Sequence, residues 1–109
     1  MGTFTVGQVI SSSFPFSDLS TSKKRPAIIV AVVDFDNIIL CQVTSKPYSS
    51  TRAIALSSTD FESGGLSRES FIRPDKLFTA DSTVVDNIHG ILKEEKTQKI
   101  LEALRRLFS

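Results

Sequence analysis

The sequence predicts a mainly β domain, either a compact antiparallel barrel or two small sheets, that ends in an amphipathic helix. Three observations lead to this prediction. A hairpin of two apolar strands lies before the middle of the chain, short strand-like segments separated by turn residues continue to about residue 85, and an apolar stripe at helical spacing occupies the C-terminal end. The 109 residues contain no internal repeat and no linker, so residues 1–109 are predicted to form one domain.

The first element is expected between residues 6 and 16, in a short mixed segment that ends in Phe-Pro-Phe. Proline has no backbone N–H, which excludes the end of this segment from a central strand. A polar loop rich in small hydroxyl residues follows over residues 17–24. The N-terminal part of the chain is therefore predicted as one short strand and a loop.

The clearest element is a hairpin. Residues 27–33 form a continuous, largely β-branched apolar run, which is typical of a strand buried on both faces. Residues 34–37 supply the turn, and residues 38–43 return as the partner strand. Antiparallel pairing about this turn puts residues near 27 opposite residues near 44, so Arg25 and Thr44 are expected at the same end of the hairpin.

Shorter elements and one helix complete the prediction. Residues 52–56 and 70–73 are predicted as strands, with one or two more at 77–79 and 83–85, while 64–65 and 87–90 are predicted as loops. From residue 93 to 108, apolar residues recur at helical spacing, and acidic residues lead while basic residues end the segment, as suits a helix dipole. This stripe is expected to pack on the sheet or on a partner chain.

The composition is that of an ordinary globular protein. Hydrophobic residues make up 40% and charged residues 23%, which argues against a disordered chain. The net charge is only +1, so binding of nucleic acid would need a local cluster of positive charge. One cysteine and one histidine exclude a Cys/His zinc site within one chain, and no metal or other cofactor is predicted. The sequence has neither a membrane-length apolar run nor a signal peptide, which predicts a cytoplasmic protein.

Two polar residues at the open end of the hairpin are candidates for chemistry. Arg25 follows Lys23 and Lys24, and its planar guanidinium can hold a phosphate by two hydrogen bonds, which an ammonium cannot. Thr44 and Ser45 close the neighbouring strand, so a guanidinium and a hydroxyl would meet at one rim and could bind an oxyanion. The residues alone leave the alternative open that both are ordinary solvated strand ends.

The remaining candidates are weaker. His89 is the sole histidine, and no carboxylate or cysteine is spaced to work with it, so it is interpreted as a surface residue of a loop. Asp34 and Asp36 fit a hairpin turn better than a cation site. The chain lacks both a glycine-rich phosphate loop and a Gly-x-Ser-x-Gly motif.

Three sequence motifs occur in order along the chain. The first combines Phe-Pro-Phe-Ser-Asp-Leu-Ser at 14–20 with Lys-Arg-Pro-Ala-Ile-Ile-Val at 24–30, and the second is Leu-Cys-Gln-Val-Thr-Ser at 40–45. The third combines Gly-Gly-Leu at 64–66 with Ser-Phe-Ile-Arg-Pro-Asp-Lys-Leu-Phe at 70–78. Taken together, from about residue 7 to the end, the chain resembles the MazF/PemK toxins of type II toxin-antitoxin systems. This resemblance implies an SH3-like barrel of the MazF/CcdB kind, a homodimer, and a cognate antitoxin as partner.

The resemblance also implies an activity. Members of the family are sequence-specific endoribonucleases (mRNA interferases) that cleave single-stranded RNA without a metal and leave 2′,3′-cyclic phosphate and 5′-hydroxyl ends. Their catalytic arginine and threonine correspond here to Arg25, expected to stabilise charge and protonate the leaving oxygen, and Thr44, expected to bind the scissile phosphate. Because arginine is a poor base, the general base stays unassigned. Contacts to RNA are expected from Lys23, Lys24, Ser45, Lys46 and Arg73.

One departure from the family pattern and two alternatives remain. The family usually has Gly-Asp near its first strand, whereas this chain has Gly7 and Gln8, so a carboxylate that would orient a partner is missing. The alternatives are a non-catalytic SH3-like binding module and a gyrase-directed toxin of the CcdB type. Retention of both Arg25 and Thr44 argues against the first, and the Arg-Pro and Thr-Ser motifs favour RNA over gyrase.

Overall fold

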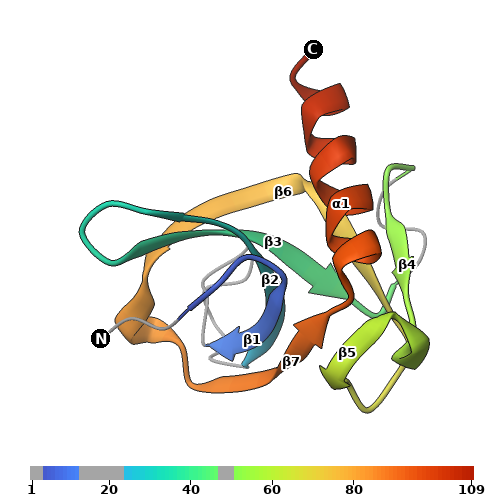
Figure 1. Cartoon of the computed structure of the whole chain (residues 1–109), viewed down its shortest axis with the longest axis horizontal. Coiled ribbons are helices and arrows are strands. Elements are labelled where there is room, and N and C mark those ends of the chain that lie inside the picture. The colour runs from blue at the N-terminus through green and yellow to red at the C-terminus, as the bar shows by residue number, and fades with distance from the viewer. Residues whose placement is uncertain (1–3, 13–23, 47–50) are drawn as a thin grey trace.

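The computed structural model describes residues 4–12, 24–46 and 51–109, which contain a seven-stranded sheet and a C-terminal helix (Figure 1). The strands are β1 (Gln8–Ser12), β2 (Arg25–Val33), β3 (Asn37–Thr44), β4 (Ile54–Leu56), β5 (Phe61–Gly64), β6 (Ser70–Asp81) and β7 (Asn87–Leu92). They lie in the order β4-β6-β3-β2-β1-β7-β5, and every neighbouring pair is antiparallel. Two 3₁₀ turns, η2 (Ser58–Asp60) and η3 (Ser82–Val84), and the helix α1 (Glu94–Leu107) complete the described fold.

The sheet curls into a half-barrel, so that β7 and β5 return towards the helix (Figure 1). A register shift interrupts the pairing of β1 with β7, β2 with β3, β3 with β6 and β5 with β7. Such irregularities bend a strand and increase its twist, which is what a small sheet needs in order to curl. The predicted mainly β class with a C-terminal helix is confirmed, with one sheet rather than two.

Apolar side chains cover both faces of the central strands. One core cluster includes Val9, Ile28, Cys41, Ile72 and Ile100, and a second cluster contains Ile10, Ala27, Ile29, Ile38 and Leu40. Successive residues of a strand point to opposite faces, so a strand buried on both faces has to be apolar throughout. This explains the apolar residues 27–30 of β2, whereas Val32 and Val33 at the end of the run are 50% and 42% exposed. The predicted hairpin of β2 and β3 is confirmed.

Three sequence-based expectations after residue 56 are wrong. Residues 70–81 form one strand rather than two or three short ones, because the register shift in β6 accommodates the buried Pro74 between Arg73 and Leu77. The strand expected at 83–85 is replaced by η3, and the loop expected at 87–90 is the start of β7. Polar and exposed residues at the start of β7 conceal its strand pattern. The short strand β5 is not predicted by the sequence at all.

The predicted amphipathic helix is confirmed, and the structure shows what its apolar stripe contacts. Ile100 is fully buried in the first core cluster, and Leu101 and Leu104 pack against the same cluster. The stripe therefore packs on the curled sheet of its own chain, while Phe108 beyond the helix end is 74% exposed. No helix in the described part of the chain is long and apolar enough to cross a membrane.

Candidate active site

A cleft of about 640 Å³ opens at one end of the β2–β3 hairpin, and both predicted catalytic residues line it. Arg25 is the first residue of β2 and Thr44 the last of β3. The cleft is completed by residues of β1, β7 and the connection between β5 and β6. Of the predicted RNA-binding residues, Lys24, Ser45 and Lys46 also line it.

A β-bulge brings Arg25 and Thr44 into line with each other. Near the turn, Val33 lies opposite Asn37, but the register shifts between Ile29 and Ala31, so that Ala27 lies opposite Gln42. Continuing this register by two residues puts Arg25 opposite Thr44, closer than simple pairing about the turn predicts. On the other side of β2, Ser12 of β1 lies opposite Arg25, so the backbone of Arg25 is paired with β1. A guanidinium on a paired strand is positioned more firmly than one on a loop.

The hydroxyl of Thr44 is oriented by the backbone that follows it. The Lys46 N–H donates a hydrogen bond to Thr44 Oγ1 at 3.2 Å. A threonine hydroxyl has one proton and two lone pairs, so this bond leaves the proton of Thr44 available to a ligand. Arg25 and Thr44 can therefore both donate hydrogen bonds to an oxyanion in the cleft.

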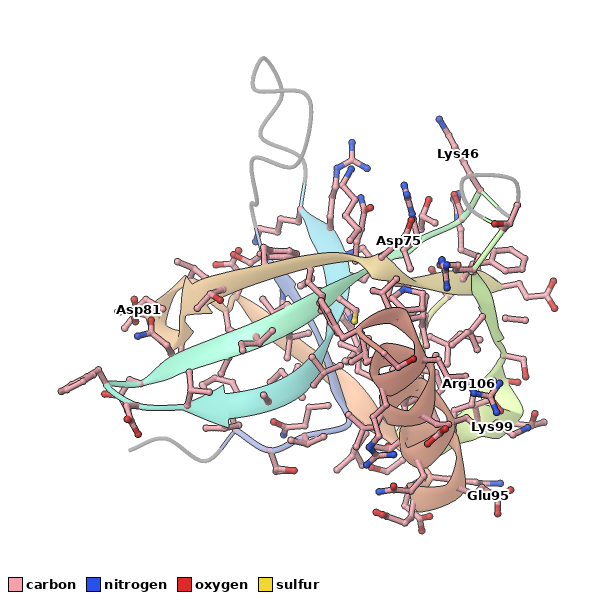
Figure 2. The ribbon with its side chains drawn as sticks, turned by 90° about the horizontal axis from the view of Figure 1, so that it is seen from above. Lys46, Asp75, Asp81, Glu95, Lys99 and Arg106 are labelled. Atoms are coloured by element: carbon pink, nitrogen blue, oxygen red, sulfur yellow. The ribbon has the colours of Figure 1, made fainter. Side chains whose placement is uncertain are left out.

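The cleft is strongly cationic although the chain as a whole carries a net charge of only +1. Four basic side chains line it, those of Lys24, Arg25, Lys46 and Arg68, and none of the described lining residues is an aspartate or glutamate. At the edge, Lys24 Nζ lies 3.8 Å from a carboxylate oxygen of Asp86, an exposed pair of small energetic weight. Figure 2 shows Lys46 extending outward on the opposite side of the molecule from Glu95 and Lys99 of the helix. The local cluster of charge that nucleic-acid binding requires is thus present.

Sequence reasoning missed two charged or titratable residues of this cleft, Arg68 and His89. Arg68 lies in the connection before β6, and no pattern in the sequence relates that connection to the β2–β3 hairpin. The sequence predicts a surface loop at His89, but His89 lies in β7 and is half-buried against the cleft. Only the return of β7 alongside β1 brings it there, so no local signal could have placed it.

Of the other predicted RNA-binding residues, Arg73 does not line the cleft and Lys23 lies outside the described residues. Arg73 lies on β6 opposite Gln42, and its guanidinium forms an ion pair with Asp75 at 3.0 Å. Lys23 lies outside the described residues, as do residues 14–20 of the first motif and most of the loop predicted at 17–24. Gln8, which stands where the family usually has aspartate, accepts a hydrogen bond from the Thr5 N–H at 2.8 Å and does not line the cleft.

The cysteine belongs to the core rather than to the site. Cys41 is fully buried in the cluster beneath the helix, and burial, with a further contribution from Asp75, raises its pKa to about 12. A thiol that stays protonated at neutral pH is neither a nucleophile nor a metal ligand. Within residues 4–12, 24–46 and 51–109, no three His, Cys, Asp or Glu side chains gather into a group that could hold a metal ion.

The sequence as a whole matches a family model described as a PemK-like, MazF-like toxin of type II toxin-antitoxin systems, over residues 5–108. The chain belongs to this toxin family. The resemblance predicted from the ordered motifs is thereby confirmed. No curated protein matches the sequence of this chain.

Solved structures of endoribonucleases and MazF toxins share the fold. A mycobacterial endoribonuclease in complex with its cognate antitoxin is 15% identical, with a TM-score of 0.74 over 99% of this chain and 95% of that chain. The Mycobacterium tuberculosis toxin MazF-mt6 is 15% identical, with a TM-score of 0.71 over 93% and 95% of the two chains. MazF from Deinococcus radiodurans is 15% identical, with a TM-score of 0.72 over 94% of each chain. These likenesses confirm the predicted MazF-like barrel.

Proposed function

We propose that this toxin is a sequence-specific, metal-independent endoribonuclease that cleaves single-stranded RNA and is neutralised by a cognate antitoxin. The observation that carries the proposal is the convergence of Arg25 and Thr44 in one cationic cleft. Membership of the toxin family supports it, as does the description of a structural neighbour as an endoribonuclease with its cognate antitoxin. We also propose that residues 1–109 form a single toxin domain that acts in the cytoplasm, where its RNA substrate is found.

Binding of the substrate follows from the charge of the cleft. The scissile phosphate would lie between the guanidinium of Arg25, which can form two parallel hydrogen bonds with it, and the hydroxyl of Thr44. Lys24, Lys46 and Arg68 would contact neighbouring phosphates, since nothing acidic in the described lining opposes them. Ser45 adds a neutral hydrogen-bonding group. Lys23 and Arg73 are also proposed to contact RNA.

The chemistry that these groups support is an internal transesterification. The ribose 2′-oxygen attacks the adjacent phosphorus, the bond from phosphorus to the 5′-oxygen breaks, and the products carry a 2′,3′-cyclic phosphate and a 5′-hydroxyl. The phosphorane between them carries extra negative charge, which Arg25 would stabilise while also protonating the departing 5′-oxygen. No metal is needed for this step, because the positive charge is supplied by the side chains of the cleft.

We further propose that the toxin is a homodimer whose RNA lies across both subunits. The family resemblance supports this assembly, and large apolar side chains such as Val32, Phe35 and Ile88 are exposed on the single chain. Sedimentation analysis should then give twice the 12.0 kDa mass of one chain at micromolar concentration. A monomer at all concentrations would contradict the dimer without affecting the assignment of the cleft.

The test of the proposed activity is cleavage of a long, end-labelled, single-stranded RNA by purified toxin in EDTA. Wild type, Arg25→Ala and Arg105→Ala are compared, the last because Arg105 is an exposed arginine of the helix. We expect discrete fragments ending in cyclic phosphate from wild type and Arg105→Ala. Cleavage by Arg25→Ala should be slower by about 10²- to 10³-fold, the usual cost of removing one charge-stabilising donor.

Intact RNA from folded wild-type protein, over several diverse transcripts, would contradict the proposal. That result would instead favour one of the two alternatives, a non-catalytic binding module or a toxin that acts on gyrase.

A further inference from the structure

We infer that His89 is the general base of this cleft, the group that removes the proton from the attacking ribose 2′-hydroxyl. The inference rests on the proposed function and deepens it, because it fills the one role that Arg25 and Thr44 leave open. Arginine stays protonated at neutral pH, and a threonine hydroxyl is a far weaker base than an imidazole.

The position of His89 in β7 is produced by a β-bulge. In the pairing of β1 with β7, Val9 lies opposite Gly90 and Ile10 lies opposite Ile88, so His89 is the extra residue between them. A bulge disrupts the ladder and redirects the side chain of the extra residue, which is why bulges are common next to active sites. Here the half-buried imidazole lines the same cleft as Arg25 and Thr44.

The backbone of His89 is held in place from the opposite side by β5. The Gly65 N–H donates a hydrogen bond to the His89 carbonyl oxygen at 3.0 Å. Gly64 approaches so closely that a Cβ added to it would lie 2.1 Å from that same oxygen, and its φ of +76° favours glycine. Because β7 lies between β1 and β5 in the sheet, the backbone of His89 is fixed, and its imidazole is held at a fixed depth in the cleft.

No other described residue lining the cleft offers a suitable proton acceptor. The charged groups that share the cleft with the imidazole are Lys24 and Arg25 at the start of β2, Lys46 after β3, and Arg68 before β6. The nearest carboxylate in sequence, that of Asp86, does not line the cleft and pairs with Lys24. Histidine is the side chain that ordinarily gains and loses a proton near neutral pH, whereas lysine, arginine and aspartate change charge outside that range.

The step balances without any further reactant. The proton of the 2′-hydroxyl passes to the unprotonated nitrogen of His89 as the bond from the 2′-oxygen to phosphorus forms. The bond from phosphorus to the 5′-oxygen breaks, and that oxygen takes a proton from Arg25. His89 then loses its proton to solvent and Arg25 regains one, so no water, oxidant or metal is consumed.

The test is the pH dependence of single-turnover RNA cleavage by wild type, His89→Gln and Lys99→Gln, the last on an exposed site of the helix. For wild type, the rate should rise with pH and then level off, as expected for a base that must be unprotonated. His89→Gln should be slower by about 10²-fold or more and should lose this rise. Its binding of a 2′-deoxy analogue that cannot be cleaved should be unchanged, and Lys99→Gln should match wild type.

Two further measurements separate a base from a structural residue. Added imidazole should restore cleavage by His89→Ala but not by Arg25→Ala. Thermal unfolding checks the fold of each variant, and His89→Asn replaces His89→Gln if the latter does not fold. A wild-type rate that shows no rise with pH over the range in which the protein stays folded overturns the inference without any variant.

The outcomes also separate the inference from the proposed function. If wild type cleaves RNA and His89→Gln cleaves it at the same rate with the same pH profile, the inference alone is overturned. If wild type cleaves no RNA, the proposed function is wrong and the inference falls with it.

Discussion

Arg25 and Thr44 line one cleft, and one extra residue in β2 sets their alignment along the hairpin. Without the bulge between Ile29 and Ala31, the two side chains would be offset along the hairpin rather than opposed. Their residue types and their common end of the hairpin are predicted from the sequence, since both follow from a strong strand pattern with an evident turn. Their final alignment is not predicted from the sequence, because no residue pattern in an apolar run such as residues 27–33 indicates a bulge.

At the same scale, the hydroxyl of Thr44 can be tested apart from its bulk. Thr44→Val keeps the shape but removes the donor, whereas Thr44→Ser keeps the donor. A hydrogen bond to a charged group contributes about 1.5–3 kcal/mol, so we expect single-turnover cleavage by Thr44→Val to be about 10- to 100-fold slower. Thr44→Ser should stay close to wild type, and equal rates for Val and Ser would show that the hydroxyl does not contact the phosphate.

The missed residues share a different physical cause. Arg68 and His89 are not distinguished by any local pattern, and they reach the cleft only through the pairing of distant segments. Arg73 shows the reverse case, since it lies within a family motif but its guanidinium is engaged with Asp75 on the same strand. A basic residue in a motif is therefore less informative than the side chains that surround it.

At the scale of elements, the pairing of β5 with β7 depends on two glycines that face each other. Gly64 lies opposite Gly90, and a Cβ added to Gly90 would lie 2.3 Å from the Ser63 carbonyl oxygen. We expect Gly90→Ala to lower the free energy of unfolding by about 2–3 kcal/mol, because the backbones of β5 and β7 would have to move apart to admit the methyl group. The measurement is urea unfolding followed by circular dichroism.

Gly65 supplies the matched control for this prediction. A Cβ added to Gly65 meets nothing within 4 Å, so Gly65→Ala should change the free energy of unfolding by less than about 0.5 kcal/mol. If Gly90→Ala were as stable as Gly65→Ala, the close approach of β5 and β7 would be contradicted.

The turn η2 links β5 to the start of the helix through Asp60. The Ser57 N–H donates to its carboxylate at 2.8 Å, Lys96 Nζ lies 3.4 Å away, and the Lys93 N–H donates to its backbone carbonyl oxygen at 2.9 Å. Burial acts to raise the pKa of Asp60, but the bond from Ser57 and the charge of Lys96 outweigh it and lower the pKa below its ordinary 3.8. The carboxylate therefore stabilises the fold above pH 3.8, and this contribution disappears as the pH falls through the lowered pKa.

Asp60→Asn tests this link. At neutral pH we expect the variant to lose about 1 kcal/mol of unfolding free energy, since a partly buried ion pair and a charged hydrogen bond become neutral. The difference from wild type should shrink as the pH falls from 3.8 through the lowered pKa of Asp60, because the wild-type carboxylate is then neutralised as well. The measurement is urea unfolding of wild type and variant at neutral pH and at a pH below 3.8. A difference in unfolding free energy of equal size at the two pH values would contradict the role of the charge.

At the scale of the whole molecule, the charge is nearly balanced but unevenly placed. Four described cations line the cleft, while the helix carries acidic and basic residues together on its exposed surface. Attraction of RNA should therefore be local and moderately dependent on salt. If these four cations contact phosphates of single-stranded RNA, the logarithm of the association constant should fall with the logarithm of salt concentration with a slope of about −3.

Single substitutions measure how much each residue contributes to this salt dependence. Lys46→Ala should make it shallower by about 0.7, whereas Lys99→Ala, on the opposite side of the molecule in Figure 2, should leave it unchanged. Fluorescence anisotropy with an uncleavable 2′-deoxy analogue measures both. Equal effects of the two substitutions would mean that RNA does not bind preferentially at the cleft.

The sequence by itself determined the mainly β class, the β2–β3 hairpin, the amphipathic helix, the toxin family, and Arg25 and Thr44 as a candidate pair. Each of these depends on contacts between near neighbours or on motifs written in consecutive residues. Only the tertiary structure decided that β6 is one strand, that residues 87–92 pair with β1 and β5, and that Arg68 and His89 line the cleft. The physical reason is that the bulges and close glycine contacts that curl the sheet depend on pairing between segments far apart in the chain, which local patterns do not encode.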